Sequence, residues 1–103
     1  MLEYKVKREG KRNVPVFAFE DAGHALLGEF LLAEARLFGE ELLPFLSGCE
    51  KASGAAEFAG NVFRVEAAEG RAKVINDLTD KECSLSVHEL EALVKEYLAL
   101  LED

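Results

Sequence analysis

Hydrophobic and polar positions alternate in two stretches near the start of the chain. Residues 2–8 (LEYKVKR) place an apolar side chain at every second position as far as Val6, and residues 14–19 (VPVFAF) form a run of β-branched and aromatic residues. A period of two is typical of strands with one buried face, and residues 9–13 are long enough for a loop between them. The sequence therefore predicts a two-stranded hairpin.

The next segment favours a helix but contains several helix breakers. Apolar residues recur at helical spacing from Leu26 onward, yet one helix over residues 25–52 would contain three glycines and Pro44. In a helix interior, glycine costs about 1 kcal/mol and proline about 3 kcal/mol. We therefore predict a shorter helix, from about residue 32 to residue 46, that Pro44 kinks or ends.

Residues 20–23 (EDAG) lie between the predicted hairpin and this helix. Their composition is typical of a turn, in which Gly23 would take a positive φ. We accordingly predict a second hairpin turn here and a third strand over residues 24–30. A helix over residues 24–30 is the alternative that the sequence leaves open.

The second half of the chain repeats the order of strands and helix. Residues 56–67 and residues 71–77 alternate between apolar and polar side chains, which predicts a fourth and a fifth strand. Ser86 and Glu89 have the spacing of a capping box, and the apolar residues that follow lie on one face of a helix over residues 87–102.

Together these elements predict one α+β domain over residues 1–103. Its antiparallel sheet would have four to five strands in the order ββ(β)α-ββα, with two helices packed on one face. A chain of 103 residues, half of them apolar, is long enough to bury one core without disulfide bonds.

The net charge of −8 is unevenly distributed along the chain. Five basic and two acidic side chains give residues 1–13 a charge of +3, which leaves −11 for the other ninety residues. An acidic surface repels phosphate backbones, so we expect no binding to duplex nucleic acid. No apolar run approaches the roughly 20 residues of a membrane helix, and no signal peptide is evident, so we expect no membrane association and a cytoplasmic location.

Few residues have the spacing of a reactive site. Glu20, Asp21 and His24 could bind a divalent metal, but one histidine without a partner at ligand spacing is more typical of a polar turn. His88 and Glu89 begin a zinc-protease motif in which the second histidine is replaced by Ala92. The sequence therefore predicts no catalytic, cofactor-binding or metal-binding residue.

The chain contains two cysteines, Cys49 and Cys83, which are 34 residues apart and belong to no CxxC pair. We expect both to be reduced thiols that behave as small hydrophobic residues. Whether either thiol, His24 or His88 has a chemical role stays open from the sequence.

The central helix carries more leucines than one buried stripe needs. These are Leu32, Leu37, Leu43 and Leu46. Surplus apolar residues favour a contact surface for a partner or for a second copy of the chain, so a homodimer is possible. Our main hypothesis is a non-enzymatic protein-interaction or regulatory module. The alternatives are a metal-binding protein or enzyme that uses Glu20, Asp21 and His24, and an acidic, immunity-like inhibitor of a basic enzyme.

The order of several short motifs resembles the YacL-like proteins, a family of small uncharacterised bacterial proteins. The motifs are Gly23-His24 followed by Gly28 and an acidic helix, Ala59-Gly60 opening a strand pair that runs through Val74, and Ser84-Leu85-Ser86 before a terminal amphipathic helix that reaches Tyr97. The resemblance implies a bacterial origin and a third strand after Gly23, but no activity.

Overall fold

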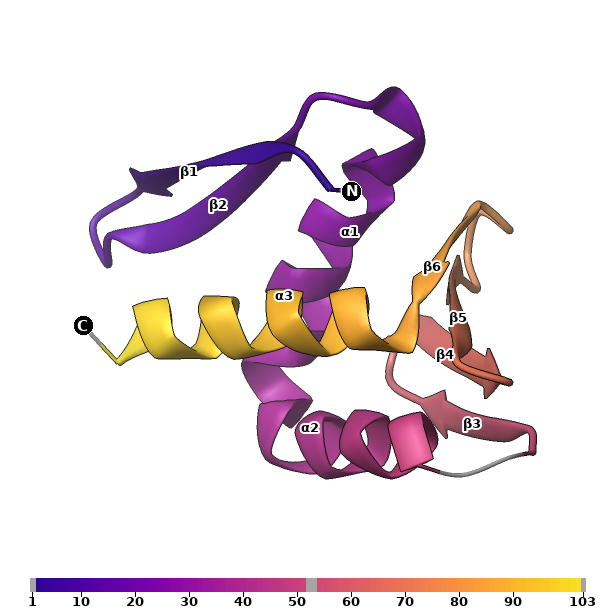
Figure 1. The fold of residues 1–103 in the computed structure, drawn as a ribbon. Helices are drawn as coiled ribbons and strands as arrows, with labels where there is room; N and C mark the ends of the chain where they lie inside the picture. Colours follow the sequence, from indigo (N-terminus) through magenta and orange to yellow (C-terminus); the bar gives the residue numbers. More distant parts are fainter. Residues whose placement is uncertain (1, 52–53, 103) are drawn as a thin grey trace.

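The computed structural model describes residues 2–51 and 54–102 and has an α+β fold (Figure 1). The strands are β1 (Tyr4–Glu9), β2 (Val14–Phe19), β3 (Ala56–Ala59), β4 (Phe63–Ala68), β5 (Arg71–Asn76) and β6 (Glu82–Ser86). The helical segments are the 3₁₀ turn η1 (Ala22–His24), the helix α1 (Ala25–Phe30), the π-helical segment η2 (Leu31–Ala35), and the helices α2 (Arg36–Lys51) and α3 (Val87–Leu101).

The larger sheet has four antiparallel strands in the order β3-β4-β5-β6. One row of facing residues runs from Phe58 through Val65 and Val74 to Cys83, and this side of the sheet packs against the helices. The prediction of an antiparallel sheet is therefore confirmed in part: a four-stranded sheet is present, but residues 56–67, predicted as one strand, form the two strands β3 and β4. Strand β6 was missed, although Cys83 and Leu85 alternate with polar residues there.

The predicted N-terminal hairpin is confirmed, but β1 and β2 form a two-stranded sheet of their own. This hairpin lies over the C-terminal half of α3 (Figure 1). The Tyr4 hydroxyl donates a hydrogen bond to Glu96, and the Phe17 ring meets the Tyr97 ring edge-on at 5.8 Å. The prediction of a single sheet is wrong because the apolar face of the hairpin packs on α3 rather than extending the larger sheet.

The predicted third strand over residues 24–30 is wrong, because this segment is helical. Leu26, Leu27 and Phe30 are buried on one face of α1. Gly28 lies so close to β2 that a Cβ atom there would be 2.8 Å from the Phe17 carbonyl oxygen. The glycine that suggested a helix break is thus what allows the helix to contact the strand.

Residues 20–23 do not form the predicted hairpin turn. The Asp21 side chain accepts a hydrogen bond of 2.7 Å from the Gly23 backbone N–H and so caps η1. Gly23 is not among the glycines with a positive φ, which are Gly10, Gly54 and Gly70. The chain therefore turns directly from β2 into a helix.

The helix predicted over residues 32–46 is longer than expected and bends earlier. It continues from α1 through η2 into α2 and reaches Lys51. The non-helical residue is Phe38, with φ −119° and ψ 20°, rather than a residue beside Pro44. Pro44 lies within α2 and does not end it, so the break in the helix is at Phe38 rather than at the proline.

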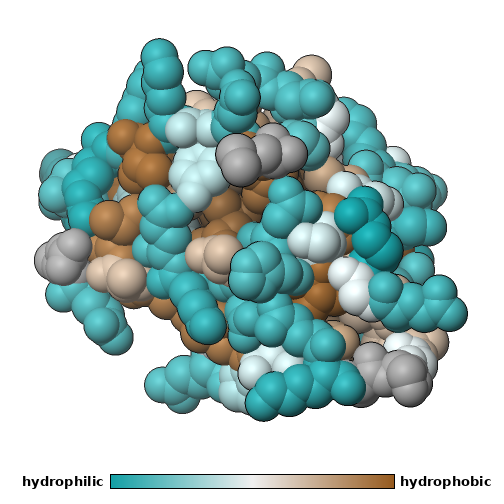
Figure 2. Space-filling model, in the orientation of Figure 1, coloured by the Kyte–Doolittle hydropathy of each residue, from teal (hydrophilic) through white to brown (hydrophobic). Residues whose placement is uncertain are grey.

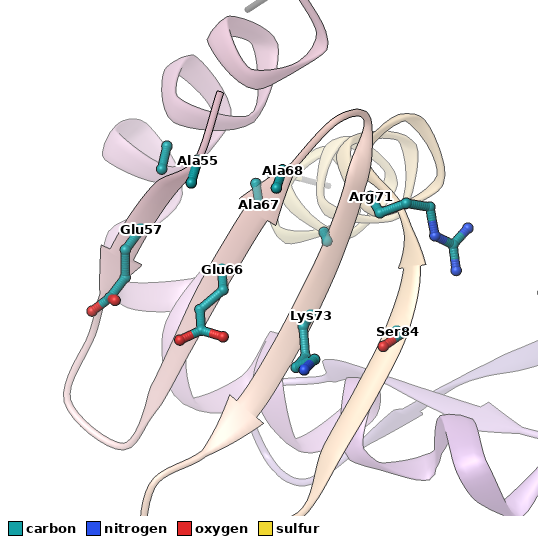
Figure 3. Close-up of a pocket in the computed structure, with 10 residues that line it drawn as sticks. Ala55, Glu57, Glu66, Ala67, Ala68, Arg71, Lys73 and Ser84 are labelled. Carbon is teal, nitrogen blue, oxygen red and sulfur yellow. The ribbon is translucent and has the colours of Figure 1, made fainter. Parts of the chain in front are cut away.

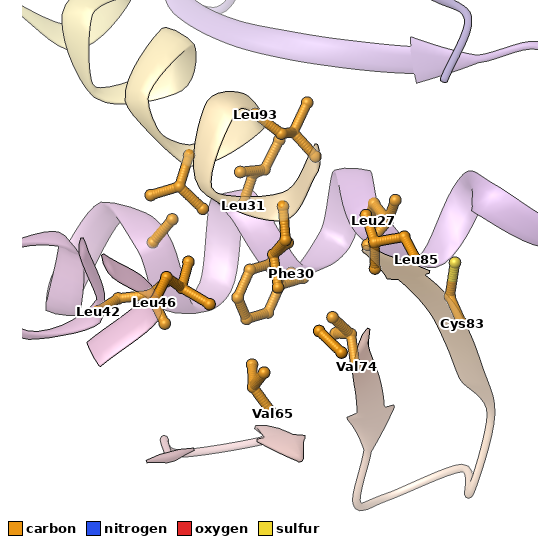
Figure 4. Packing of buried hydrophobic residues seen from close by; sticks show 14 of the residues in the cluster. Leu27, Phe30, Leu31, Leu42, Leu46, Val65, Val74, Cys83, Leu85 and Leu93 are labelled. Atoms are coloured by element: carbon orange, nitrogen blue, oxygen red, sulfur yellow. The ribbon is translucent and has the colours of Figure 1, made fainter. Parts of the chain in front are cut away.

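The core lies between the helices and the inner face of the larger sheet (Figure 4). Leu27, Phe30 and Leu31 project into it from α1 and η2, and Leu42 and Leu46 from α2. Helix α3 closes the core along the row that contains Leu90, Leu93, Val94 and Tyr97, all of them buried.

The predicted C-terminal helix and its capping box are confirmed. The Ser86 hydroxyl oxygen accepts a hydrogen bond from the Glu89 backbone N–H at 3.0 Å, and the Glu89 carboxylate accepts one from the Ser86 backbone N–H at 3.1 Å. Among the described residues, no helix combines the length and the apolar character needed to cross a bilayer.

Candidate functional site

A groove of about 630 Å³ lies between the start of α2 and the end of α3. Its apolar lining comes from Leu37, Phe38, Leu43, Pro44, Leu98 and Leu101. Figure 2 shows apolar surface between hydrophilic side chains on this face, including the region between the C-terminal half of α3 and the beginning of α2. We call this feature the α2–α3 groove.

The groove forms where α2 and α3 approach each other closely. A Cβ atom at Gly39 would lie 2.7 Å from Leu98 Cδ2, so a larger residue at this crossing would have to displace the Leu98 side chain. The break at Phe38 turns α2 away from α1, and the ring of Phe38 packs against Phe58 of β3 at 6.4 Å. Leu37, one residue before this contact, is left with 65% of its surface exposed.

The rim of the α2–α3 groove is mainly acidic. Glu40, Glu41 and Glu102 are exposed along it, and Arg36 is its one basic residue. An exposed leucine beside an apolar floor and charged edges is the arrangement found at many protein contact surfaces. The groove can therefore bind another molecule by burying apolar surface, with specificity set by charge.

The surplus leucines of the sequence divide between this groove and other places. Leu37 and Leu43 line the groove, as a contact surface requires. Leu46 is fully buried in the core, because α2 packs against β3 and the neighbouring helices. Leu32 is 37% exposed but does not line the groove. Periodicity identified the right helix, but it could not separate these four residues.

A second hollow, of about 530 Å³, lies on the outer face of the larger sheet (Figure 3). Alanines line part of it, and Glu57, Glu66, Lys73 and Ser84 form one row of facing residues across the four strands. Several charged groups on this face pair within the chain: Arg64 contacts Glu66 and Asp77, and Lys73 lies 3.8 Å from Glu82. This pattern is typical of a solvated sheet face.

Glu20, Asp21 and His24 are not brought together around a common point. The Asp21 side chain caps η1, and Glu20 is exposed. The His24 ring packs edge-on against Phe19, and its Nδ1 atom is buried without a hydrogen-bond partner in the structure. Across residues 2–51 and 54–102, no three or more His, Cys, Asp and Glu side chains are grouped so that they could hold a metal ion.

The two cysteines and His88 lie on three different elements of the fold. Cys83 is on the buried face of β6, where burial, together with the charge of Asp21, raises the pKa of its thiol. Burial also raises the pKa of the Cys49 thiol in α2. His88 is exposed in the first turn of α3, with its Nδ1 atom 3.1 Å from Glu50 Oε1. Raised thiol pKa values lower the thiolate fraction and hence the reactivity of both cysteines at neutral pH.

Sequence reasoning missed Glu34, a fully buried carboxylate in η2. Its Oε1 atom accepts hydrogen bonds from the backbone N–H groups of Val62 and Phe63, at 2.7 and 3.0 Å, and its Oε2 atom accepts one from Asn61 at 3.0 Å. Glu34 therefore ties the π-helical segment to the β3–β4 loop. A single glutamate inside the apolar run from Phe30 to Ala35 was the signal that could have revealed it.

Comparisons with protein-family models, with curated proteins and with solved structures found no match to this chain. The resemblance to YacL-like proteins therefore stays a prediction. The function has to be argued from the geometry of the chain itself.

Proposed function

We propose that this chain is a protein-interaction module that binds a partner protein in the α2–α3 groove and performs no catalysis itself. The observation that carries the proposal is Leu37, which is 65% exposed at the edge of a groove with an apolar lining. Burying an exposed leucine contributes about 1.5–3 kcal/mol to association. An exposed apolar side chain beside an apolar groove is therefore suited to a contact with another protein.

The environments of the candidate reactive groups support binding rather than chemistry. Asp21 caps a helical turn, and Glu89 completes the capping box of α3. Cys83 is buried with a raised pKa, which disfavours the nucleophilic thiolate. Each of these groups has a structural role that explains its position.

The acidic rim of the groove also favours a more specific alternative, in which the partner is a basic enzyme that the chain inhibits. Glu40, Glu41 and Glu102 would then contact cationic side chains around a site of that enzyme. Both versions use the same surface. They differ in whether binding suppresses an activity of the partner.

Site-specific photocrosslinking in living cells of the native host tests the proposal. We would place p-benzoylphenylalanine at Leu37 and, as a control, at Leu78, which is 80% exposed in the β5–β6 turn and does not line the groove. We expect an adduct of defined mass from position 37 and none from position 78. Equal labelling from both positions, or no adduct from position 37, would contradict docking in the groove.

A matched pair of variants separates loss of binding from loss of folding. Leu37→Asp should remove the interaction, and Leu78→Asp should preserve it, because only Leu37 lines the groove. Both side chains are largely exposed, so the thermal stability of each variant should stay within about 0.5 kcal/mol of the wild type. Loss of partner binding by both variants would contradict the proposal.

A further inference from the structure

We infer that the occupant of the α2–α3 groove is an amphipathic helix of another protein, with lysine or arginine beside its apolar anchors. The inference rests on the proposed function and adds the chemistry of the partner. It draws on the shape of the groove, the charge around it and the polarity of the end of α3.

The shape of the groove suits a helix. A channel between two helices with an apolar floor receives side chains that a third helix projects at positions i, i+3 or i+4, and i+7. Leu43 and Pro44 of α2 face the channel from one side, and Leu98 and Leu101 of α3 line the other. These last two residues are three positions apart on α3, so they lie on the same face of that helix.

The charge of the rim selects a basic partner. Among the described residues that line the groove, three are acidic (Glu40, Glu41 and Glu102) and one, Arg36, is basic. Opposite charges at the edge of an interface raise the association rate and disfavour partners of the wrong charge. Lysine or arginine beside the apolar anchors of the partner helix would meet this acidic rim.

The end of α3 also favours cations. The C-terminus of a helix carries a partial negative charge, because its last carbonyl groups lack partners within the helix. The last turn of α3 contains no basic residue. Arg8 of the hairpin donates a hydrogen bond of 3.1 Å to the Leu100 carbonyl oxygen, which shows that this end accepts a guanidinium group, although Leu100 itself is thereby satisfied within the chain.

The occupant is another protein rather than a second copy, because the described helices of this chain do not have the required charge. Helix α1 has no basic residue, and α2 has Arg36 and Lys51 at its two ends. The only lysine or arginine of α3, Lys95, lies 3.8 Å from Glu91 of the same helix. The basic residues near the start of the chain lie in β1 and its loop, which are not helical.

The experiment uses the full chain and a fluorescein-labelled peptide of about 16 residues, long enough to form a helix on binding. Its leucines are spaced i, i+3, i+4 and i+7, with lysines between them. One control peptide replaces the lysines by glutamate, and the other has the basic composition in a scrambled order. Fluorescence anisotropy measures binding to each protein variant.

We expect the basic amphipathic peptide to bind with a dissociation constant of the order of micromolar, as for a small interface. Leu37→Asp should weaken binding at least tenfold because an apolar anchor is lost. Glu40→Lys combined with Glu41→Lys should weaken it about tenfold and should increase binding of the glutamate peptide. If the variant with two lysines folds poorly, Glu40→Gln combined with Glu41→Gln neutralises the same two carboxylates without reversing their charge.

The matched controls carry the same chemical changes outside the groove. Leu78→Asp adds a carboxylate at another exposed leucine. Glu20→Lys combined with Glu57→Lys changes the net charge by the same amount as the rim variant, at two exposed positions that do not line the groove. Both controls should bind the basic peptide within about twofold of the wild type.

Each other outcome overturns the inference in a distinct way. Equal binding of the scrambled peptide would mean that the helical spacing of the leucines is not recognised. Equal binding of the glutamate peptide would mean that basic charge is not recognised. An adduct from Leu37 in cells together with no peptide binding would leave the groove as a docking site and reject the basic helix. Crosslinking only between copies of the chain, with a dimeric mass in solution, would reject the foreign partner and identify a self-interface.

Discussion

Replacing Glu34 by glutamine tests whether its buried carboxylate holds the β3–β4 loop against the helices. The substitution preserves the size of the side chain but replaces one carboxylate oxygen by an NH₂ group. Glutamine can still accept hydrogen bonds from Val62 and Phe63 through its remaining oxygen, whereas its NH₂ group would face the Asn61 N–H, another donor.

The expected loss of stability follows from these three hydrogen bonds. A hydrogen bond to a charged group contributes about 1.5–3 kcal/mol, and a neutral one about 0.5–1.5 kcal/mol. Losing the bond to Asn61 and weakening the other two should cost about 2 kcal/mol or slightly more. For a domain of this size, that loss lowers the Tm by about 10 °C.

Thermal and urea unfolding, followed by circular dichroism, measure this loss. Glu29→Gln is the control, because Glu29 is exposed on α1 and should change stability by less than about 0.5 kcal/mol. A Glu34→Gln variant as stable as the control would refute the role assigned to the carboxylate.

Gly60 provides an independent arm of the same test. A Cβ atom there would lie 1.9 Å from Glu34 Oε2, so Gly60→Ala must displace the carboxylate or the loop. We expect Gly60→Ala to be strongly destabilising in the wild-type background. In the Glu34→Ala background its additional cost should be smaller by at least about 1 kcal/mol, because residues in contact do not act additively. Additive losses would mean that the two sites are not in contact.

Four further predictions concern the cap of α3, the titration of Glu89 and of Tyr4, and the reactivity of the two thiols. Ser86→Ala should cost about 1 kcal/mol through loss of the helix cap. The Ser86 backbone hydrogen bond is the main cause that lowers the pKa of Glu89 in the folded protein. The contribution of Glu89 to folding stability should therefore be present above pH 4.5 and lost as the pH falls through the lower, folded-state pKa. Unfolding experiments at acidic pH measure this loss. Burial, assisted by the Glu96 hydrogen bond, raises the pKa of Tyr4 to about 12. The contribution of Tyr4 to folding stability should therefore be present below pH 10 and lost as the pH rises towards 12. Comparing the tyrosinate absorbance of the wild type with that of Tyr4→Phe measures this pKa. Both thiols should react slowly with an aromatic disulfide reagent at pH 7, with half-buried Cys49 faster than buried Cys83.

The elements that the sequence predicted correctly depend on local interactions. The capping box joins Ser86 to a residue three positions away, and the hairpin loop reverses the chain with Gly10 and Asn13 at positive φ. In both cases, neighbouring residues carry the whole signal. Side-chain periodicity was sufficient for β5 and α3 for the same reason, but it did not divide residues 56–67 into β3 and β4.

The errors came from contacts between residues distant in the sequence. Gly28 was counted as a helix breaker, but the close approach of β2 is what requires a glycine there. Glu34 was overlooked because its partners are about 27 residues away. In the candidate site, Leu37 and Leu43 were predicted contact residues, whereas the role of Gly39 depends on Leu98 of another helix.

The packing of the hairpin on α3 has a consequence for folding during synthesis. Arg8 and Leu100 are 92 positions apart, yet they share a hydrogen bond. Because β1 and β2 precede α3 in the chain, they are synthesised before it, and the aromatic face around Phe17 lacks its contact with Tyr97 until α3 has been made. Because contacts between distant residues form slowly, docking of the hairpin should be a late step, and the nascent chain should expose an apolar surface that chaperones can bind until α3 emerges.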